Sequence, residues 1–368
     1  CPLVNAIDGS GTLPARYHSA WTNRCLEAIN TCGKFLLVTS VSLVGLLLLV
    51  FATEETASRI SNIRTGVMGA GTFGLGNKGA VATSFLYCST AICFVNSHLA
   101  AGEKEGNIDD RIEDFEIIVF KMRLLLDTEA QENLEKSTSM SKSSQSASLR
   151  HGSSERESWT SDREARTNLL EHDAIIWAGD MNMRLWKDAS TKESVERSAV
   201  WECLGDARKQ KLFMEAHDEL HILRAKGGLY SAFEEAPVSF SPSYKLKPLP
   251  QRGKRVSLNA VPHASNEQYF YDAKRVPAWT DRVLWRTRGD VGIQPETYER
   301  ISSVNFSDHR AVRLKLTLVA KDVRWDVLKQ ICAEPLSAQT SPNTDIPQRY
   351  DSVIDVHTSK MAEPENAC

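Results

Sequence analysis

The chain has 368 residues, of which 42% are hydrophobic and 25% charged, an ordinary balance for a globular protein. Its formal net charge of -3 argues against a protein that wraps nucleic acid, although a local basic patch remains open. The eight cysteines are scattered singly without a CxxC pair, which favours reduced thiols in the cytoplasm over a disulfide-rich extracellular module.

The first pronounced feature along the chain is an apolar run from Phe35 to Ala52, FLLVTSVSLVGLLLLVFA, near the length that spans a bilayer. Polar residues alternate through its first half and Gly45 interrupts it, so the run favours buried strands. Periodicity alone does not exclude a spanning helix.

A glycine-dense stretch follows, and within it GAGTFG at 69–74 matches the GxGxxG pattern. A dinucleotide site would need a helix next and an acid about twenty residues on, but a β-like sequence follows. A P-loop is excluded because Asn77 precedes Lys78 and Gly79 replaces the Ser/Thr. The stretch predicts a tight loop that presents Asn77 and Lys78.

The remaining elements alternate between strands and helices. We expect strands at 80–85, 91–96, 174–178 and 311–319, helices at 110–127 and within 194–225, and short strands and loops at 240–284. This order predicts one layered α/β or α+β domain over residues 1–320.

Two segments are too polar to bury a core. Residues 130–161 are dominated by Ser, Lys and Glu, and predict a disordered insertion in a surface loop. The polar tail at 321–368 shows no periodicity and is expected to be disordered as well.

Four clusters carry chemically active side chains at the ends of predicted elements. They are FVNSHLAAG with His98, IIWAGDMNMRL with Asp180 and Asn182, KRVPAWTDRVLW with Asp281, and NFSDHRAV with Asp308 and His309. Each alone has an ordinary interpretation as a turn, a cap or a surface pair. Together, Asp, Asn and His at strand ends with cations between them are typical of metal-assisted phosphoester hydrolysis.

These clusters resemble a known family. NKGAV, VNSHLAAG, GDMNMRL, FSPSYK, KRVPAWTDR and SDHRAV occur in the order found in inositol polyphosphate 5-phosphatases, whose superfamily includes DNase I-like nucleases. The resemblance extends over residues 21–318 and includes the apolar run. It implies a four-layer α/β/β/α sandwich of two mainly antiparallel sheets.

The resemblance also implies roles for the catalytic residues. Asp180 would orient or activate the attacking water, while Asn182 and His98 hold the scissile phosphate. His309 would stabilise charge on the phosphoryl group, oriented by Asp281. A carboxylate behind an imidazole favours the protonated form, which fits that pairing.

Further residues would bind the metal and the substrate. Asp308 would help to place Mg²⁺. The other phosphates of a phosphoinositide lipid or inositol phosphate would contact cations and polar groups, namely Asn77, Lys78, Tyr244, Lys245, Lys274 and Arg275.

A peripheral membrane contact is expected at the mouth of the site. Residues 242–256 are basic and contain no acid, and the glycine loop carries Phe73 and Leu75. Lipid-active members of the family use an apolar loop at this place, so a cytoplasmic protein that touches membranes is implied. The alternative is a solvated basic loop and two core residues.

The chain also departs from the family pattern. Met183, Thr280 and Ser243 replace the more usual Tyr, Cys and Thr, and no substitute is evident for the Glu that is the family's principal metal ligand. We therefore expect a fragment whose N-terminal strands are missing. The alternatives are a nuclease or sphingomyelinase of the same superfamily, and a phosphoinositide-binding scaffold that has lost catalysis.

Overall fold

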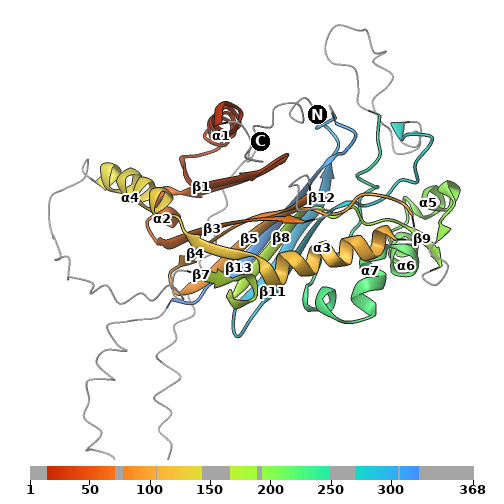
Figure 1. Ribbon diagram of the computed structural model, residues 1–368. Helices are drawn as coiled ribbons and strands as arrows, with labels where there is room; N and C mark the ends of the chain where they lie inside the picture. The colour runs from red at the N-terminus through yellow and green to blue at the C-terminus, as the bar shows by residue number, and fades with distance from the viewer. Residues whose placement is uncertain are drawn as a thin grey trace, which may run out of the picture.

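The centre of the computed structural model is a seven-stranded sheet in the order β11-β8-β5-β4-β3-β6-β7 (Figure 1). The structure describes residues 15–70, 78–104, 106–142, 166–188, 193–247, 270–305 and 307–322. The strands of this sheet are β3 (Ile60–Ala70), β4 (Lys78–Tyr87), β5 (Thr90–His98), β6 (Arg123–Leu126), β7 (Arg166–Asn168), β8 (Ala174–Asp180) and β11 (Asp281–Thr287). Only β5 and β8 pair in parallel among them, so these two strands end at the same edge.

Two β-hairpins cover one face of this sheet. The first pairs β1 (Phe35–Leu43) with β2 (Leu46–Thr53), and the second pairs β12 (Gly292–Ile301) with β13 (Ala311–Val319). Val38 of the first hairpin and Ile176 of β8 belong to one apolar cluster, and Leu316 of the second hairpin packs against this cluster. In the described part of the chain the expected second sheet is therefore two separate hairpins. A further short pair joins β9 (Trp186–Asp188) to β10 (Glu193–Ser194).

Helices complete the layers on the two outer sides. Helix α1 (Ala15–Ile29) contacts β1, while α3 (Asn107–Lys121) packs on the opposite face of the large sheet (Figure 1). There the ring of Phe115 stacks on Trp177 of β8 with centroids 4.4 Å apart. The other helical segments are α2 (Glu54–Ala57), α4 (Thr128–Lys142), η3 (Leu169–Glu171), α5 (Arg197–Cys203), α6 (Ala207–His217), α7 (Glu219–Ala225) and η4 (Leu229–Ala232). The predicted layered α/β class is confirmed.

The apolar run is a hairpin and not a spanning helix. Its strands β1 and β2 meet at a turn where Val44 and Gly45 have φ of 31° and 30°. Glycine takes a positive φ without steric cost, which explains the residue that interrupts the run. Across the described ranges, none of the helices combines the length and apolar character needed to cross a bilayer.

Two predicted boundaries were wrong. The helix expected at 110–127 ends at Lys121, because Met122 is extended and the following residues pair as β6 with β3 and β7. The insertion expected to be disordered from Ala130 begins instead with α4, whose Leu134 is 2% exposed in the cluster under the hairpins. Low overall hydrophobicity hid a helix that buries one narrow apolar face. Residues 143–165 and 323–368 lie outside the described residues.

The other predicted elements were found where expected. The four predicted strands lie within β4, β5, β8 and β13, and the charged stretch at 194–225 contains α5, α6 and α7. Strand order and register then decide which of the predicted site residues come together.

Candidate active site

The register of three neighbouring strands places three predicted site residues in one row. His98, the last residue of β5, pairs with Asp180 at the end of parallel β8. Asp180 pairs in turn with Asp281, the first residue of antiparallel β11. Gly179 has φ of 145°, and a Cβ there would lie 2.1 Å from the carbonyl oxygen of Ser97. A glycine is therefore required before Asp180 to let the strands approach.

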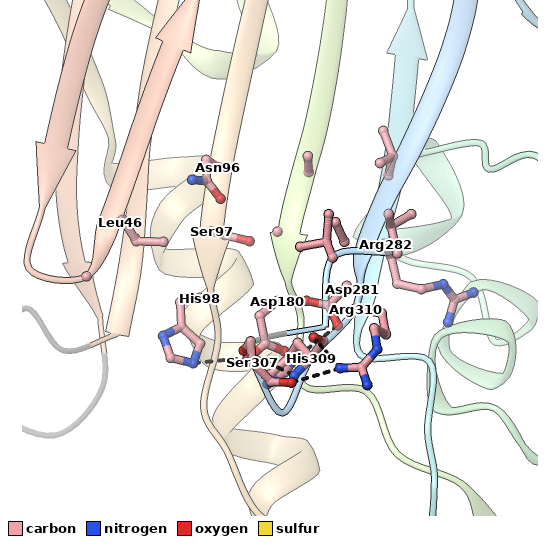
Figure 2. Close-up of a pocket in the computed structure, with 17 residues that line it drawn as sticks. Leu46, Asn96, Ser97, His98, Asp180, Asp281, Arg282, Ser307, His309 and Arg310 are labelled. Atoms are coloured by element: carbon pink, nitrogen blue, oxygen red, sulfur yellow. Dashed lines mark hydrogen bonds and ion pairs between the residues drawn. The ribbon is translucent and has the colours of Figure 1, made fainter. Parts of the chain in front are cut away.

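The loop before β13 adds His309 to this row. Its Nδ1 lies 2.9 Å from Asp281 Oδ2, and its Nε2 lies 3.9 Å from Asp180 Oδ2. The same Asp281 oxygen accepts hydrogen bonds from Ser243 Oγ at 2.6 Å and Thr280 Oγ1 at 2.9 Å. Figure 2 shows His98 and His309 near Asp180 at one end of a cavity.

The imidazole of His309 is held in its protonated form. Burial works against the charge, but the hydrogen bond to Asp281 and the charges of Asp281, Asp180 and Asp308 outweigh it and raise the pKa of His309 to about 9. At neutral pH the side chain is therefore an imidazolium, which donates hydrogen bonds and favours a negatively charged ligand.

The carboxylate of Asp180 is held in its ionised form. Burial would raise its pKa, but the hydrogen bond with His98, the charges of His309 and His98, and the backbone N–H of Asn182 lower it. The His98 Nε2 atom lies 3.3 Å from Asp180 Oδ2 and 2.6 Å from Lys78 Nζ. Burial lowers the pKa of Lys78, which Asp180 partly offsets. Lys78, predicted as a substrate-binding residue, therefore contacts the same His98 nitrogen that faces Asp180.

Asn182 is fixed by its own neighbours. Its backbone adopts φ of 54°, and its N–H donates to Asp180 Oδ1 at 3.0 Å. The side-chain Nδ2 donates to the Leu99 carbonyl at 3.0 Å, while Oδ1 accepts from Arg184 Nη2 at 2.7 Å. The backbone N–H of Asn182 therefore holds the carboxylate of Asp180 in one orientation.

Two of the predicted substrate-binding residues, Tyr244 and Lys245, contact residues of this site, and Arg275 is linked to it through Glu103. The Tyr244 ring lies 4.6 Å from the His309 ring, and Lys245 Nζ lies 3.8 Å from Asp308 Oδ2. Arg275 Nη1 donates to Glu103 Oε2 at 3.1 Å. The side chain of Lys274 is exposed. The other three predicted contacts, Asn77, Phe73 and Leu75, lie outside the described residues.

Sequence reasoning did not single out Arg184 or Glu103. Arg184 contacts Asn182 and Glu103, and its guanidinium carbon lies 4.8 Å from the Tyr244 ring centroid. Arg184 stands two residues after Asn182 in the GDMNMRL motif, so its position was visible in the sequence. Its partner Glu103 lies 81 residues away, and no local pattern reveals that contact.

The candidate site residues line a cavity of about 440 Å³. Figure 2 shows His98, Asp180, Asp281 and His309 at one end of it, which we call the polar end. Leu46, Val283, Val304 and Val312 also line the cavity, together with polar residues such as Asn96 and Arg310. The polar end presents an imidazolium and a carboxylate side by side.

A metal ion has candidate ligands at this end. Asp180, Asp281 and His309 each offer one atom, and these atoms lie within 4.8 Å of one another. His309 is a poor ligand while it is protonated, and Asp281 Oδ2 already accepts three hydrogen bonds. The other candidate ligand atoms are Asp281 Oδ1 and the carboxylate oxygens of Asp180 and of Asp308, whose side chain is 41% exposed. Carboxylate oxygens suit a hard cation such as Mg²⁺ or Ca²⁺.

The fold and this row of residues define a class of protein. Residues 6–315 match the family described as Endonuclease/Exonuclease/phosphatase family 2, and the chain belongs to this family.

Among named relatives, the chain is 31% identical to the type I inositol polyphosphate 5-phosphatase 8 of Arabidopsis thaliana, over 75% of this chain and 46% of that protein. It is 30% identical to the phosphatidylinositol 4,5-bisphosphate 5-phosphatase INP51 of Saccharomyces cerevisiae, over 84% of this chain and 26% of that protein. The chain thus spans less than half the length of these curated relatives.

A solved structure shares the fold. The inositol polyphosphate 5-phosphatase domain of SPsynaptojanin, in complex with inositol (1,4)-bisphosphate and a calcium ion, matches with a TM-score of 0.55 and 26% identity. The match covers 86% of this chain and 72% of that one. The implied resemblance to inositol polyphosphate 5-phosphatases is thereby confirmed.

Proposed function

We propose that this chain carries the site of a Mg²⁺-dependent phosphomonoester hydrolase that removes the 5-phosphate from inositol polyphosphates and phosphoinositides. The observation that carries the proposal is the row His98–Asp180–Asp281 with His309 beside it. The named relatives and the inositol (1,4)-bisphosphate complex of the similar structure support the substrate class.

The ionisation states assign complementary tasks to Asp180 and His309. Asp180, which is ionised, orients a water molecule and takes its proton as the water attacks phosphorus. The bond from phosphorus to the inositol oxygen breaks in the same step, and that oxygen takes a proton from solvent. His309, protonated and held by Asp281, donates to a phosphoryl oxygen on which negative charge develops. His98 adds a polar contact on the far side of Asp180, and Asn182 keeps the carboxylate in its orientation.

Mg²⁺ would be held by Asp308 together with further oxygen ligands at the polar end of the cavity, where Asp180 also lies. When bound, such a cation polarises the phosphoryl group and offsets its charge. Replacing Asp308 with Asn should weaken Mn²⁺ binding, measured by electron paramagnetic resonance, while leaving the fold intact. Unchanged Mn²⁺ affinity would exclude Asp308 as a ligand.

The other ring phosphates would contact Tyr244, Lys245, Lys274 and Arg275, a proposal that the contacts of Tyr244 with His309 and of Lys245 with Asp308 support. A cytoplasmic protein that contacts membranes peripherally through Phe73 and Leu75 fits this substrate class, because phosphoinositides present their headgroups at a membrane surface.

The test is phosphate release by the full-length protein from inositol 1,4,5-trisphosphate, with inositol 1,4-bisphosphate as the analogue without a 5-phosphate. We expect turnover of the first only, and at least a hundredfold loss on replacing His309 with Ala. Arg313→Gln, which breaks a surface ion pair on β13, is the control and should keep full turnover. Hydrolysis of DNA or sphingomyelin without phosphate release from the inositol ring would refute the proposal.

A further inference from the structure

One arginine joins the catalytic row to the side where the ring phosphates are proposed to bind. The Arg184 side chain is only 5% exposed, and each of its three nitrogens donates within the protein. Nε and Nη2 donate to the backbone carbonyl and the side-chain Oδ1 of Asn182, at 3.0 and 2.7 Å, and Nη1 donates to Glu103. Three of the five N–H groups of the guanidinium therefore donate to protein acceptors, and little of the side chain is exposed to a ligand.

The contacts of Arg184 fix the amide of Asn182 in one orientation. A guanidinium only donates, so the atom that faces Nη2 must be the amide oxygen. The amide nitrogen is then directed to the Leu99 carbonyl at 3.0 Å and to Asp180 Oδ2 at 3.4 Å. The orientation of the amide beside Asp180 therefore depends on Arg184.

The same guanidinium also supports the aromatic side of the site. Its central carbon lies 4.8 Å from the Tyr244 ring centroid, and the centroid of the His309 ring lies 4.6 Å from the same ring. A planar cation stacks on an aromatic face with favourable energy, which an ammonium reproduces less well in this geometry. Arg184 thus contacts both Asn182 and Tyr244, which are the neighbours of Asp180 and His309.

Two carboxylates hold Arg184 in place. Glu219, fully buried, accepts from the Arg184 backbone N–H at 3.2 Å and makes a bidentate pair with Arg111 at 2.6 and 2.7 Å. Glu103 shares its two oxygens between Arg184 and Arg275, at 3.2 and 3.1 Å. The bidentate pair with Arg111 is geometrically demanding, so it fixes Glu219 and, through the backbone N–H, the position of Arg184.

We propose that Arg184 is a positioning residue: it acts on the reaction by fixing the Asn182 amide and the Tyr244 ring, not by contacting the substrate. The inference rests on the proposed hydrolase function. A displacement of about 1 Å at such a site costs on the order of a hundredfold in rate.

The kinetic test compares Arg184→Ala and Arg184→Lys with the unmodified protein on inositol 1,4,5-trisphosphate. We expect kcat of the alanine variant to fall about a hundredfold while KM changes less than about threefold. The lysine variant should recover about tenfold at most, because one ammonium cannot span Asn182 and Glu103 and stack on Tyr244. Arg64→Ala, which removes a half-buried arginine on β3, is the matched control and should keep kcat.

Chemical rescue separates positioning from a purely structural role. Millimolar guanidinium should restore part of the kcat of Arg184→Ala, and should not affect the control or Asn182→Ala. A rise in KM together with weaker binding of inositol 1,4-bisphosphate would overturn the inference, since it would make Arg184 a substrate contact. Loss of the folded circular dichroism spectrum of both variants without any rescue would overturn it too.

A measurement without turnover tests the same link. The Asn182 side-chain amide resonance, assigned by its loss in Asn182→Ala, should shift and broaden in Arg184→Ala while the backbone spectrum stays folded. An unchanged resonance would refute the positioning role even if the protein hydrolysed nothing. A shifted resonance in a protein without phosphatase activity would instead refute the proposed function and leave the link intact.

Discussion

The raised pKa of His309 predicts that stability in EDTA should fall as the pH rises. The folded-state pKa is about 9 and the ordinary value is 6.5, so the folded protein binds the proton more tightly than the unfolded chain. The stabilisation is therefore fully present below about pH 6.5 and is lost as the pH rises through about 9. Since one pKa unit corresponds to about 1.4 kcal/mol, the proton on His309, held by Asp281, Asp180 and Asp308 together, contributes on the order of 3 kcal/mol that disappears across this window.

The assay is urea unfolding at pH 6.0, 7.5 and 9.5 with EDTA present, followed by circular dichroism. Cysteines and the α-amino group titrate in the same window, so the informative quantity is the difference between the unmodified protein and His309→Gln. That difference should shrink by about 3 kcal/mol between pH 6.0 and 9.5, and Asp281→Asn should show the same reduced slope. Parallel pH profiles for all three proteins would refute the coupling of His309 to Asp281.

Four further predictions concern single side chains or segments. Replacing Asp180 with Ala should lower kcat at least about a hundredfold while inositol 1,4-bisphosphate binding survives, and near-normal kcat would remove Asp180 from the mechanism. Leu134→Ala in α4 should destabilise the protein by about 2–4 kcal/mol in urea unfolding, whereas the control Leu212→Ala, at an exposed position, should cost less than about 0.5 kcal/mol; deletion of residues 145–161 should leave the melting temperature unchanged. Phe73→Ser should lower activity on vesicle-borne phosphoinositide and spare soluble inositol phosphate, and equal losses on both would make Phe73 a core residue.

The strands and the candidate site residues at their ends could be predicted from the sequence, because both depend on local residues. A strand of seven residues ending in Gly-Asp, such as β8, needs only its own apolar composition to be recognised. The helix α4 was not accessible, because its single deeply buried leucine packs against strands that lie far away in the sequence. The end of α3 at Lys121 was missed for the same reason, since β6 forms only through its pairing with β3 and β7.

The spatial neighbours of the site depended on topology rather than on motifs. His98 and Asp180 lie 82 positions apart, and they meet because β5 and β8 are parallel and end at one edge. The Glu103 contacts with Arg184 and Arg275 join three loops that no periodicity relates. The motifs predicted the candidate site residues, whereas the order and register of the strands determine which of these residues lie close together.

The two departures at Ser243 and Thr280 gain a physical explanation from the structure. Both hydroxyls donate to Asp281 Oδ2, the oxygen that also faces His309 Nδ1. Serine keeps the hydroxyl of the threonine that is usual at position 243, and threonine offers a stronger donor than the cysteine common at 280. These donors hold the carboxylate oxygen in place beside the imidazole. The substitutions therefore preserve the interaction by which Asp281 raises the pKa of His309, and the site keeps its imidazolium.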